Sequence, residues 1–154
     1  GDHVRKIAMG LAALGFEPGH TSSILANTRR EWTYADYAVL CAGGVSSGIY
    51  PTDAVAQVEY LMQDSASVYL FVEDEEQLDK ALECRERLPL LRRIIVWDME
   101  GLRDLDDAQV LSLAKLRELG RERRARLGAA AAKAEWRERL TSRKGEDLAI
   151  LIYT

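Results

Sequence analysis

The stretch VYLFVEDEEQLDKALECRERLPLLRRIIVW, residues 68–97, decides the fold class of this chain. It opens with the apolar run Val68–Val72, which predicts a buried strand. An amphipathic segment from Glu75 to Leu88 follows and predicts a helix, which Pro89 stops. A second apolar run, Ile94–Trp97, predicts another strand. Two strands joined by a helix favour parallel pairing through a right-handed crossover.

The same alternation of helices and strands extends towards the N-terminus. Val4, Ile7 and Leu11 recur at helical spacing, which predicts a first amphipathic helix. The short apolar run Ser23–Ala26 predicts a buried strand. The further predicted elements are a helix that carries Trp32, Ala35, Val39 and Leu40 and ends at Gly43-Gly44, a strand at Gly48–Tyr50 closed by Pro51, and a helix with Asp53 in its first turn and Ala54, Val58, Leu61 and Met62 on one face.

Two local patterns sharpen these predictions. Thr28 and Glu31 stand three positions apart, a spacing that predicts a reciprocal capping box at the start of the second helix. Tyr50-Pro51-Thr52 predicts a tight turn between a strand and a helix, because proline fixes φ and cannot continue a strand. We therefore interpret both segments as structural punctuation.

The C-terminal third has a different pattern. Residues 102–143 are charge-rich and helical in spacing, so we expect a helical charged insertion at about residues 102–145 that lies over the surface of the core. The near-continuous apolar run Leu148–Tyr153 predicts a central strand buried on both faces. Together these elements predict an α/β fold: a layered, largely parallel sheet flanked by helices.

Composition restricts the classes of partner. The net charge of −4 and the pI of about 5.3 offer no basic face for nucleic acid, so no nucleic-acid partner is expected. Cys41 and Cys84 lie in helical patterns and are expected to be unpaired thiols in a reducing compartment, which indicates a cytoplasmic location. No apolar stretch approaches the roughly 20 residues that span a bilayer.

No complete catalytic motif is present in the sequence. His3 and His20 are interpreted as ordinary surface residues rather than metal ligands. The acidic segment from Asp98 to Asp107 does not match the spacing of a calcium loop and is interpreted as a solvated loop. Gly43-Gly44 is interpreted as a helix terminus rather than a phosphate-binding turn.

One basic run stands out between Arg117 and Arg126. Its arginines could face an anionic membrane or the phosphates of CoA, which leaves peripheral membrane association open. Glu118 and Glu122 are interspersed in the run and favour a solvated helix. Oligomeric state is not indicated by any pattern.

Several segments, read in order, resemble the adenylate-forming superfamily, and within it the long-chain acyl-CoA synthetases of the bubblegum-like type. The resemblance rests on four blocks. They are Asn27-Thr28-Arg29-Arg30-Glu31-Trp32 with Ala35-Asp36, Gly43-Gly44-Val45 with Gly48-Ile49-Tyr50-Pro51-Thr52, Val58-Glu59-Tyr60-Leu61 with Asp64-Ser65 and the strand after it, and Glu146–Thr154. The last block is similar to the strand that runs, in this family, into a Ser-Gly-Thr-Thr-Gly phosphate loop.

This resemblance implies that residues 1–154 are part of the large N-terminal AMP-binding domain of an adenylate-forming enzyme, truncated before the phosphate-binding loop. The implied enzyme is a long-chain fatty acid CoA ligase that uses ATP, Mg²⁺ and CoA. Tyr153 and Thr154 begin the loop, so they are the implied nucleotide-binding residues, with Thr154 as a contact to phosphate or magnesium. The chain alone is expected to be inactive, and the alternative is a stand-alone α/β binding or regulatory module.

Overall fold

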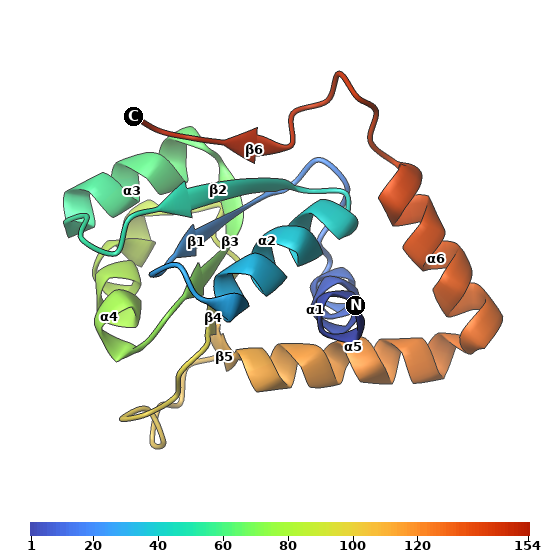
Figure 1. Ribbon diagram of the computed structural model, residues 1–154. Coiled ribbons are helices and arrows are strands. Elements are labelled where there is room, and N and C mark those ends of the chain that lie inside the picture. The colour runs from blue at the N-terminus through green and yellow to red at the C-terminus, as the bar shows by residue number, and fades with distance from the viewer.

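The computed structural model describes residues 1–154 as three layers, with helices on both faces of one six-stranded sheet (Figure 1). All strand pairs are parallel, in the order β5-β4-β3-β1-β2-β6. The strands are β1 (Thr21–Leu25), β2 (Val45–Ile49), β3 (Ser67–Val72), β4 (Arg93–Val96), β5 (Val110–Ser112) and β6 (Ile150–Leu151). The helices are α1 (Asp2–Ala13), α2 (Arg30–Cys41), α3 (Val55–Asp64), α4 (Glu75–Cys84), α5 (Leu113–Leu127) and α6 (Ala129–Thr141), with a 3-10 turn, η1, at Arg85–Arg87. The predicted fold class is confirmed.

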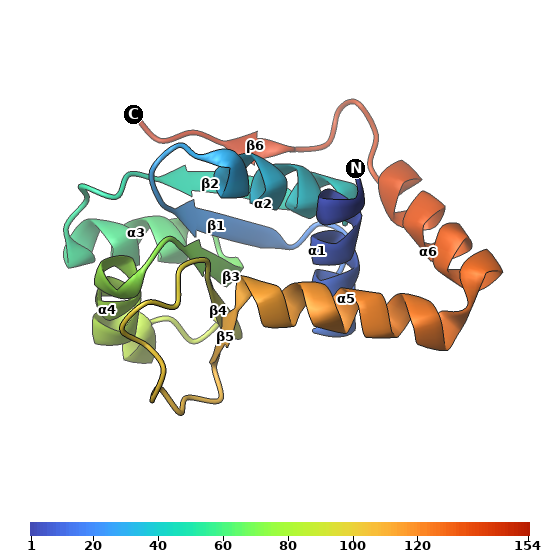
Figure 2. The same cartoon turned by 60° about the horizontal axis from the view of Figure 1, so that its bottom comes forward.

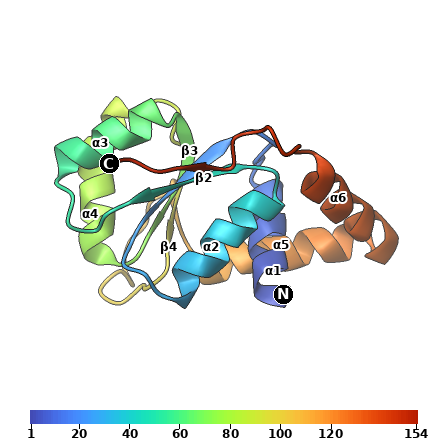
Figure 3. The same ribbon diagram turned by 45° about the horizontal axis from the view of Figure 1, so that its top comes forward.

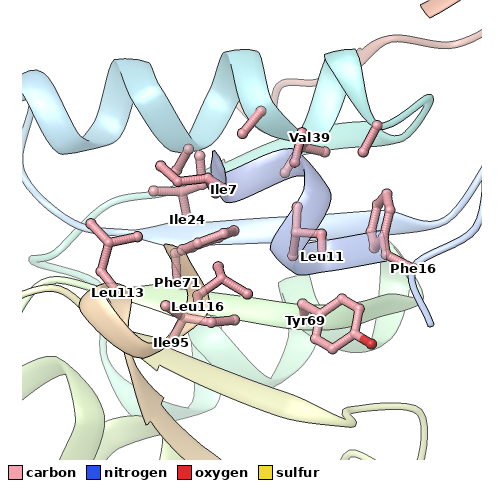
Figure 4. Close-up of a cluster of buried hydrophobic side chains, with 14 of the residues drawn as sticks. Ile7, Leu11, Phe16, Ile24, Val39, Tyr69, Phe71, Ile95, Leu113 and Leu116 are labelled. Atoms are coloured by element: carbon pink, nitrogen blue, oxygen red, sulfur yellow. The ribbon is translucent and has the colours of Figure 1, made fainter. Parts of the chain in front are cut away.

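Each face of the sheet carries its own core. Successive side chains of a strand point to opposite faces, so Tyr69 and Phe71 join one core while Leu70 and Val72 join the other. Figure 4 shows the first core, where β-strand side chains meet α1, α2 and α5. The second core packs the sheet against α3 and α4, on the other side in Figure 3. β3 therefore reads as a nearly continuous apolar run because both of its faces are buried, whereas β1 and β2 also bury serines.

Side chains cap two of the helices, but not the helix at which the sequence predicted a capping box. Asp74 caps α4 by accepting the Gln77 backbone N–H at 3.2 Å, and Ser112 caps α5 in the same way. At α2 the capping box predicted from Thr28 and Glu31 is wrong: Arg29 is the N-cap residue, and no side chain caps the helix. The carboxylate of Glu31 is bound by the flanking arginines instead, which outcompete a backbone N–H for a charged acceptor.

Several element boundaries also shift. β2 begins at Val45, earlier than predicted, because Ser46 and Ser47 are buried strand residues despite their polarity. Asp53 lies before α3, whose N-cap is Ala54. The turn predicted at residues 50–52 is present, closed by a hydrogen bond from Asp53 N–H to the Tyr50 carbonyl at 3.0 Å. Gly43 terminates the second helix with a φ of 85°.

The segment from residue 102 onward is more integrated than the sequence suggested. It contains β5, which extends the sheet beside β4, and Figure 2 shows β5 leading directly into α5. Leu113 and Leu116 of α5 are buried in the first core. Gly10 of α1 and Gly120 of α5 face each other's backbone so closely that neither position has room for a Cβ atom. Hence α5 is a core helix, not a cover over a finished core.

The predicted position of the last strand is wrong for this chain. β6 lies at the edge of the sheet and pairs with β2 alone. Ile150 is 46% exposed and Ile152 is 80% exposed, since no element covers their outer side. The apolar composition of β6 is nonetheless that of a buried strand, so this edge of the sheet exposes side chains that are normally covered.

Candidate functional site

The strand order of the parallel sheet changes direction at β1. From β1 the chain crosses through α2 on one face to β2, and then through α3 on the other face to β3, which lies on the opposite side of β1. Helices that leave a sheet in opposite directions open a crevice at the carboxyl ends of the strands, where open α/β proteins bind ligands. The loops after β1, β2, β3 and β6 meet at this edge.

A polar cluster lies in the crevice between the ends of β1 and β3. Asn27 donates its backbone N–H at 2.7 Å and its side-chain amide at 2.9 Å to one carboxylate oxygen of Glu73. Arg29 donates to the other oxygen at 3.3 Å. The cluster ties the loop after β1 to the end of β3, although 44 to 46 residues separate the partners. It fixes the loop after β1 against the end of β3.

The carboxylates of this cluster are held ionised. Desolvation by itself would raise the pKa of Glu31, but hydrogen bonds from Arg29 and Arg30 outweigh it and lower that pKa to about 2. Desolvation would likewise raise the pKa of Glu73, but the hydrogen bonds from Asn27 and Arg29 outweigh it and lower that pKa. Two arginines and two carboxylates balance in charge. The cluster therefore organises the loop without offering a net charge to a ligand.

Tyr153, a residue implied for nucleotide binding, follows β6 at the same edge. Its phenol donates a hydrogen bond of 2.8 Å to Asp64 at the end of α3, and Figure 3 shows the C-terminal segment passing beside that helix. Burial and the bond to the Asp64 carboxylate raise the pKa of Tyr153 to about 12. The phenol is therefore neutral at physiological pH, and it anchors the end of β6 to the α3 layer.

Thr154, the other implied residue, is exposed and makes no hydrogen bond through its hydroxyl. Magnesium requires near-octahedral oxygen coordination, of which one threonine supplies a single ligand. No group of three or more His, Cys, Asp or Glu side chains is placed to hold a metal ion anywhere in the chain.

A cavity of about 380 Å³ adjoins Tyr153 between α2 and the ends of β2 and β6. Its lining is mainly apolar and includes Trp32, Tyr50 and Ile152. Asp36 contributes one carboxylate oxygen that is buried and has no hydrogen-bond donor. The cavity is within the size range of small-molecule sites and presents one free acceptor.

The other residues singled out from the sequence lie elsewhere. His3 is exposed and stacks on Tyr34, and His20 accepts the Glu17 backbone N–H at 3.0 Å through Nδ1. Asp107, from the acidic segment, pairs with Arg85 at 2.5 Å. These contacts are local and structural. Cys41 and Cys84 are free thiols, as expected.

Comparison with known proteins decides the family. A family model described as AMP-binding enzyme matches residues 1–154. The chain belongs to this family of AMP-binding enzymes. It is 32% identical over 153 residues to the long-chain-fatty-acid–CoA ligase FadD15 of Mycobacterium bovis, a match that covers 99% of this chain and 23% of that protein. It is 30% identical over 118 residues to the long-chain-fatty-acid–CoA ligase ACSBG1 of Rattus norvegicus, covering 77% and 16% respectively.

Solved structures of two ligases share the fold. The anthranilate CoA ligase AuaEII, in complex with anthranoyl-AMP, superimposes with a TM-score of 0.67 at 21% identity and covers 76% of this chain and 21% of its own. Coronafacic acid ligase from Pectobacterium brasiliense gives a TM-score of 0.67 at 22% identity, over 75% and 23% of the two chains. The chain spans about a quarter of the length of these relatives or less.

Sequence reasoning assigned no role to the residues that shape this edge of the AMP-binding fold. Asn27, Arg29 and Glu73 were given no role, although Glu73 directly follows β3 and Asn27 lies two residues after the adjacent strand β1. That position was the available signal, since carboxyl ends of neighbouring parallel strands meet at one edge. Asp64 was missed as the partner of Tyr153, because 89 residues separate them and no pattern links the two.

Proposed function

We propose that this chain forms part of the large N-terminal domain of an ATP-dependent long-chain fatty acid CoA ligase. The observation that carries the proposal is the match of the family model to all 154 residues, together with relatives of 30–32% identity that are ligases of this type. The sheet edge with Tyr153 and Thr154 is where such a fold would present its nucleotide site.

The proposed reaction has two steps. The carboxylate of the fatty acid attacks the α-phosphorus of ATP, which forms an acyl-adenylate and releases pyrophosphate. The thiol of CoA then attacks the acyl carbon, forms the thioester, and releases AMP. ATP, CoA and the fatty acid are the proposed substrates. Mg²⁺ would offset the charge of the phosphates, with the Thr154 hydroxyl as one contact.

The residues of this chain act by positioning. The Asn27–Glu73 contacts hold the loop after β1, and the Tyr153–Asp64 hydrogen bond holds the end of β6. The first lies at the carboxyl edge, and the second joins the segment after β6 to the last residue of α3, so both restrict where a phosphate-binding segment following Thr154 would begin. Preorganised backbone N–H groups stabilise phosphate charge only when their support is rigid.

The chain alone should neither bind ATP tightly nor form an acyl-adenylate. One neutral hydrogen bond contributes about 1 kcal/mol net, whereas micromolar affinity requires about 8 kcal/mol. Thr154 offers one hydroxyl on an exposed terminus. Calorimetry with ATP and magnesium on the purified chain should therefore show no micromolar binding. A micromolar dissociation constant would mean that the nucleotide site lies within these residues.

A stand-alone binding or regulatory module was the alternative. Ligases among the relatives favour the enzyme instead. No helix in the structure is long and apolar enough to cross a membrane. The free thiols Cys41 and Cys84 support our proposal of a reducing, cytoplasmic location, with peripheral membrane contact left to the experiments below.

Exchange of labelled pyrophosphate into ATP by the full-length protein that carries this sequence tests the proposal. The first step is reversible, so exchange should require an acid that is a substrate. We expect strong exchange with palmitate and little with acetate or benzoate. Exchange with acetate or benzoate and none with palmitate would reject the chain-length assignment, and no exchange with any acid would reject the adenylation itself.

A further inference from the structure

A second concave surface is separate from the cavity beside Tyr153. It is a groove of about 850 Å³ between α1, α5 and α6, which we call the basic groove. In Figure 1, α5 and α6 form an L-shaped arm at the side of the sheet, and α1 lies against the inner side of α5. The basic groove shares no lining residue with the cavity beside Tyr153.

All the charged side chains that line this groove are positive. Its lining contains five cationic side chains and no carboxylate: Arg5, Arg121, Arg124, Lys133 and Arg137. Two are partly neutralised from outside the lining, since Glu118 pairs with Arg121 at 2.5 Å and Asp2 pairs with Arg124 at 3.4 Å. The other three take part in no ion pair. An overall acidic chain thus concentrates unpaired positive charge in one concave place, which favours an anionic ligand.

The floor of the basic groove is apolar. Met9, Trp136 and Leu140 line it, with alanines of α5 and α6 between them. The guanidinium of Arg5 lies 5.0 Å from the centre of the Trp136 ring, so the aromatic floor holds one cation of the rim in place. Leu140 is 44% exposed. A ligand that suits this surface must offer apolar area as well as negative charge.

The start of α6 adds donors to the same place. Gly128 and Ala129 line the groove, and no side chain caps this helix, whose N-cap residue is Gly128. The first backbone N–H groups of a helix lack partners within it and favour phosphate. Together with the guanidinium groups, they suit a phosphate better than a solitary carboxylate.

We propose that the basic groove binds a phosphate-bearing amphiphile, specifically long-chain acyl-CoA, with its acyl chain on the Trp136–Leu140 floor and its phosphates among Arg137, Lys133 and Arg5. The class of ligand follows from the groove, whereas the choice of acyl-CoA rests on the proposed function, of which it is the product. The volume lies in the range of small-molecule sites. A flat bilayer surface would fit a concave groove less well.

Photocrosslinking of the full-length protein tests this site. The probe is lauroyl-CoA that carries a photoreactive group on its acyl chain, used below its micelle concentration, and labelled peptides are mapped by mass spectrometry. Peptides from α1, α5 and α6 should be labelled. Excess lauroyl-CoA should compete, while laurate or CoA alone should compete at least tenfold more weakly, because each supplies only half of the contacts.

Matched variants locate the contact. Arg137→Glu should reduce labelling of these peptides about tenfold, whereas Arg126→Glu, the same change at an exposed arginine outside the lining, should not. Leu140→Ser should also reduce it, and Leu127→Ser, at a similarly exposed leucine of α5, should not. Thermal melting of each variant confirms that the fold is intact.

Other results would overturn the inference. If laurate competed as well as lauroyl-CoA, the groove would not recognise the phosphates. If Leu140→Ser left the labelling unchanged, the groove would recognise charge alone. Binding to anionic phospholipid vesicles with no labelling by monomeric lauroyl-CoA would assign the groove to a membrane. If these peptides were not labelled while pyrophosphate exchange was normal, this site would be rejected and the proposed function would stand. If they were labelled but no exchange occurred, the site would stand and the proposed function would be rejected.

Discussion

Substitution of Gly120 by alanine should destabilise the fold, because Gly120 lies where α5 crosses α1. A Cβ atom added there would overlap the carbonyl oxygen of Lys6 and would lie 2.8 Å from the backbone nitrogen of Gly10. Both obstacles are backbone atoms, so no side chain can rotate out of the way. The two helices would have to separate, and Leu116 would be drawn away from the core.

The size of the effect is set by two opposing contributions. Overpacking of a core contact costs about 1–3 kcal/mol and occasionally more. Replacement of glycine by alanine inside a helix returns about 1 kcal/mol. Because the obstacles are rigid, we expect the upper end of the cost and a net loss of about 2 kcal/mol. At about 2–4 °C per kcal/mol for a chain of this size, the melting temperature should fall by roughly 4–8 °C.

Thermal unfolding followed by far-ultraviolet circular dichroism measures this loss. Gly145→Ala is the matched control, since a Cβ at Gly145 meets no atom within 4 Å. The control should stay within about 0.5 kcal/mol of the parent. A Gly120→Ala variant that is as stable as the parent, or more so, would show that α5 does not pack on α1 and would refute its place in the core.

Three further predictions concern individual side chains. The pKa of Glu31 is about 2 in the fold against an ordinary 4.5, so its contribution to stability is present above pH 4.5 and should be lost as the pH falls towards 2. Urea unfolding across this pH range should show the loss, and Glu31→Gln should flatten the dependence of the unfolding free energy on pH. The phenolate absorbance lost in Tyr153→Phe should titrate near pH 12, and Asp64→Asn should move that midpoint towards about 10, the ordinary value; an unchanged midpoint would deny the Tyr153–Asp64 hydrogen bond. Arg139→Met should cost about 2 kcal/mol in denaturant unfolding, since it strips a donor from the buried Phe16 carbonyl that Arg139 reaches at 2.8 Å; no change would mean that α6 does not depend on this contact.

The fold could be predicted where burial and periodicity agree. β3 and β4 are built on apolar runs flanked by polar residues, so composition alone located them, whereas only the apolar end of β1 was located in this way. β5 escaped because Val110–Ser112 is only three residues long and follows an acidic loop. The start of β2 escaped because Ser46 and Ser47 are polar yet buried. Periodicity also cannot tell a covering helix from a core helix when, as in α5, the contact depends on a glycine.

The candidate site was less predictable, since its partners are distant in sequence. Tyr153 was implied by resemblance, but nothing in the sequence pairs it with Asp64. Glu31 was assigned to a helix cap on spacing, whereas two neighbouring arginines bind its carboxylate. Long-range contacts and competition between local partners are decided by the folded arrangement, and a linear pattern carries neither.

The transfer of oxygen from fatty acid to AMP tests the central claim most directly. The full-length protein would be given ATP, CoA and palmitate whose carboxylate carries heavy oxygen, and the nucleotide product would be weighed by mass spectrometry. Attack of the carboxylate on the α-phosphorus leaves one labelled oxygen on the released AMP, and this is the result we expect. Unlabelled AMP, or label that appears in inorganic phosphate together with ADP, would contradict activation through an acyl-adenylate.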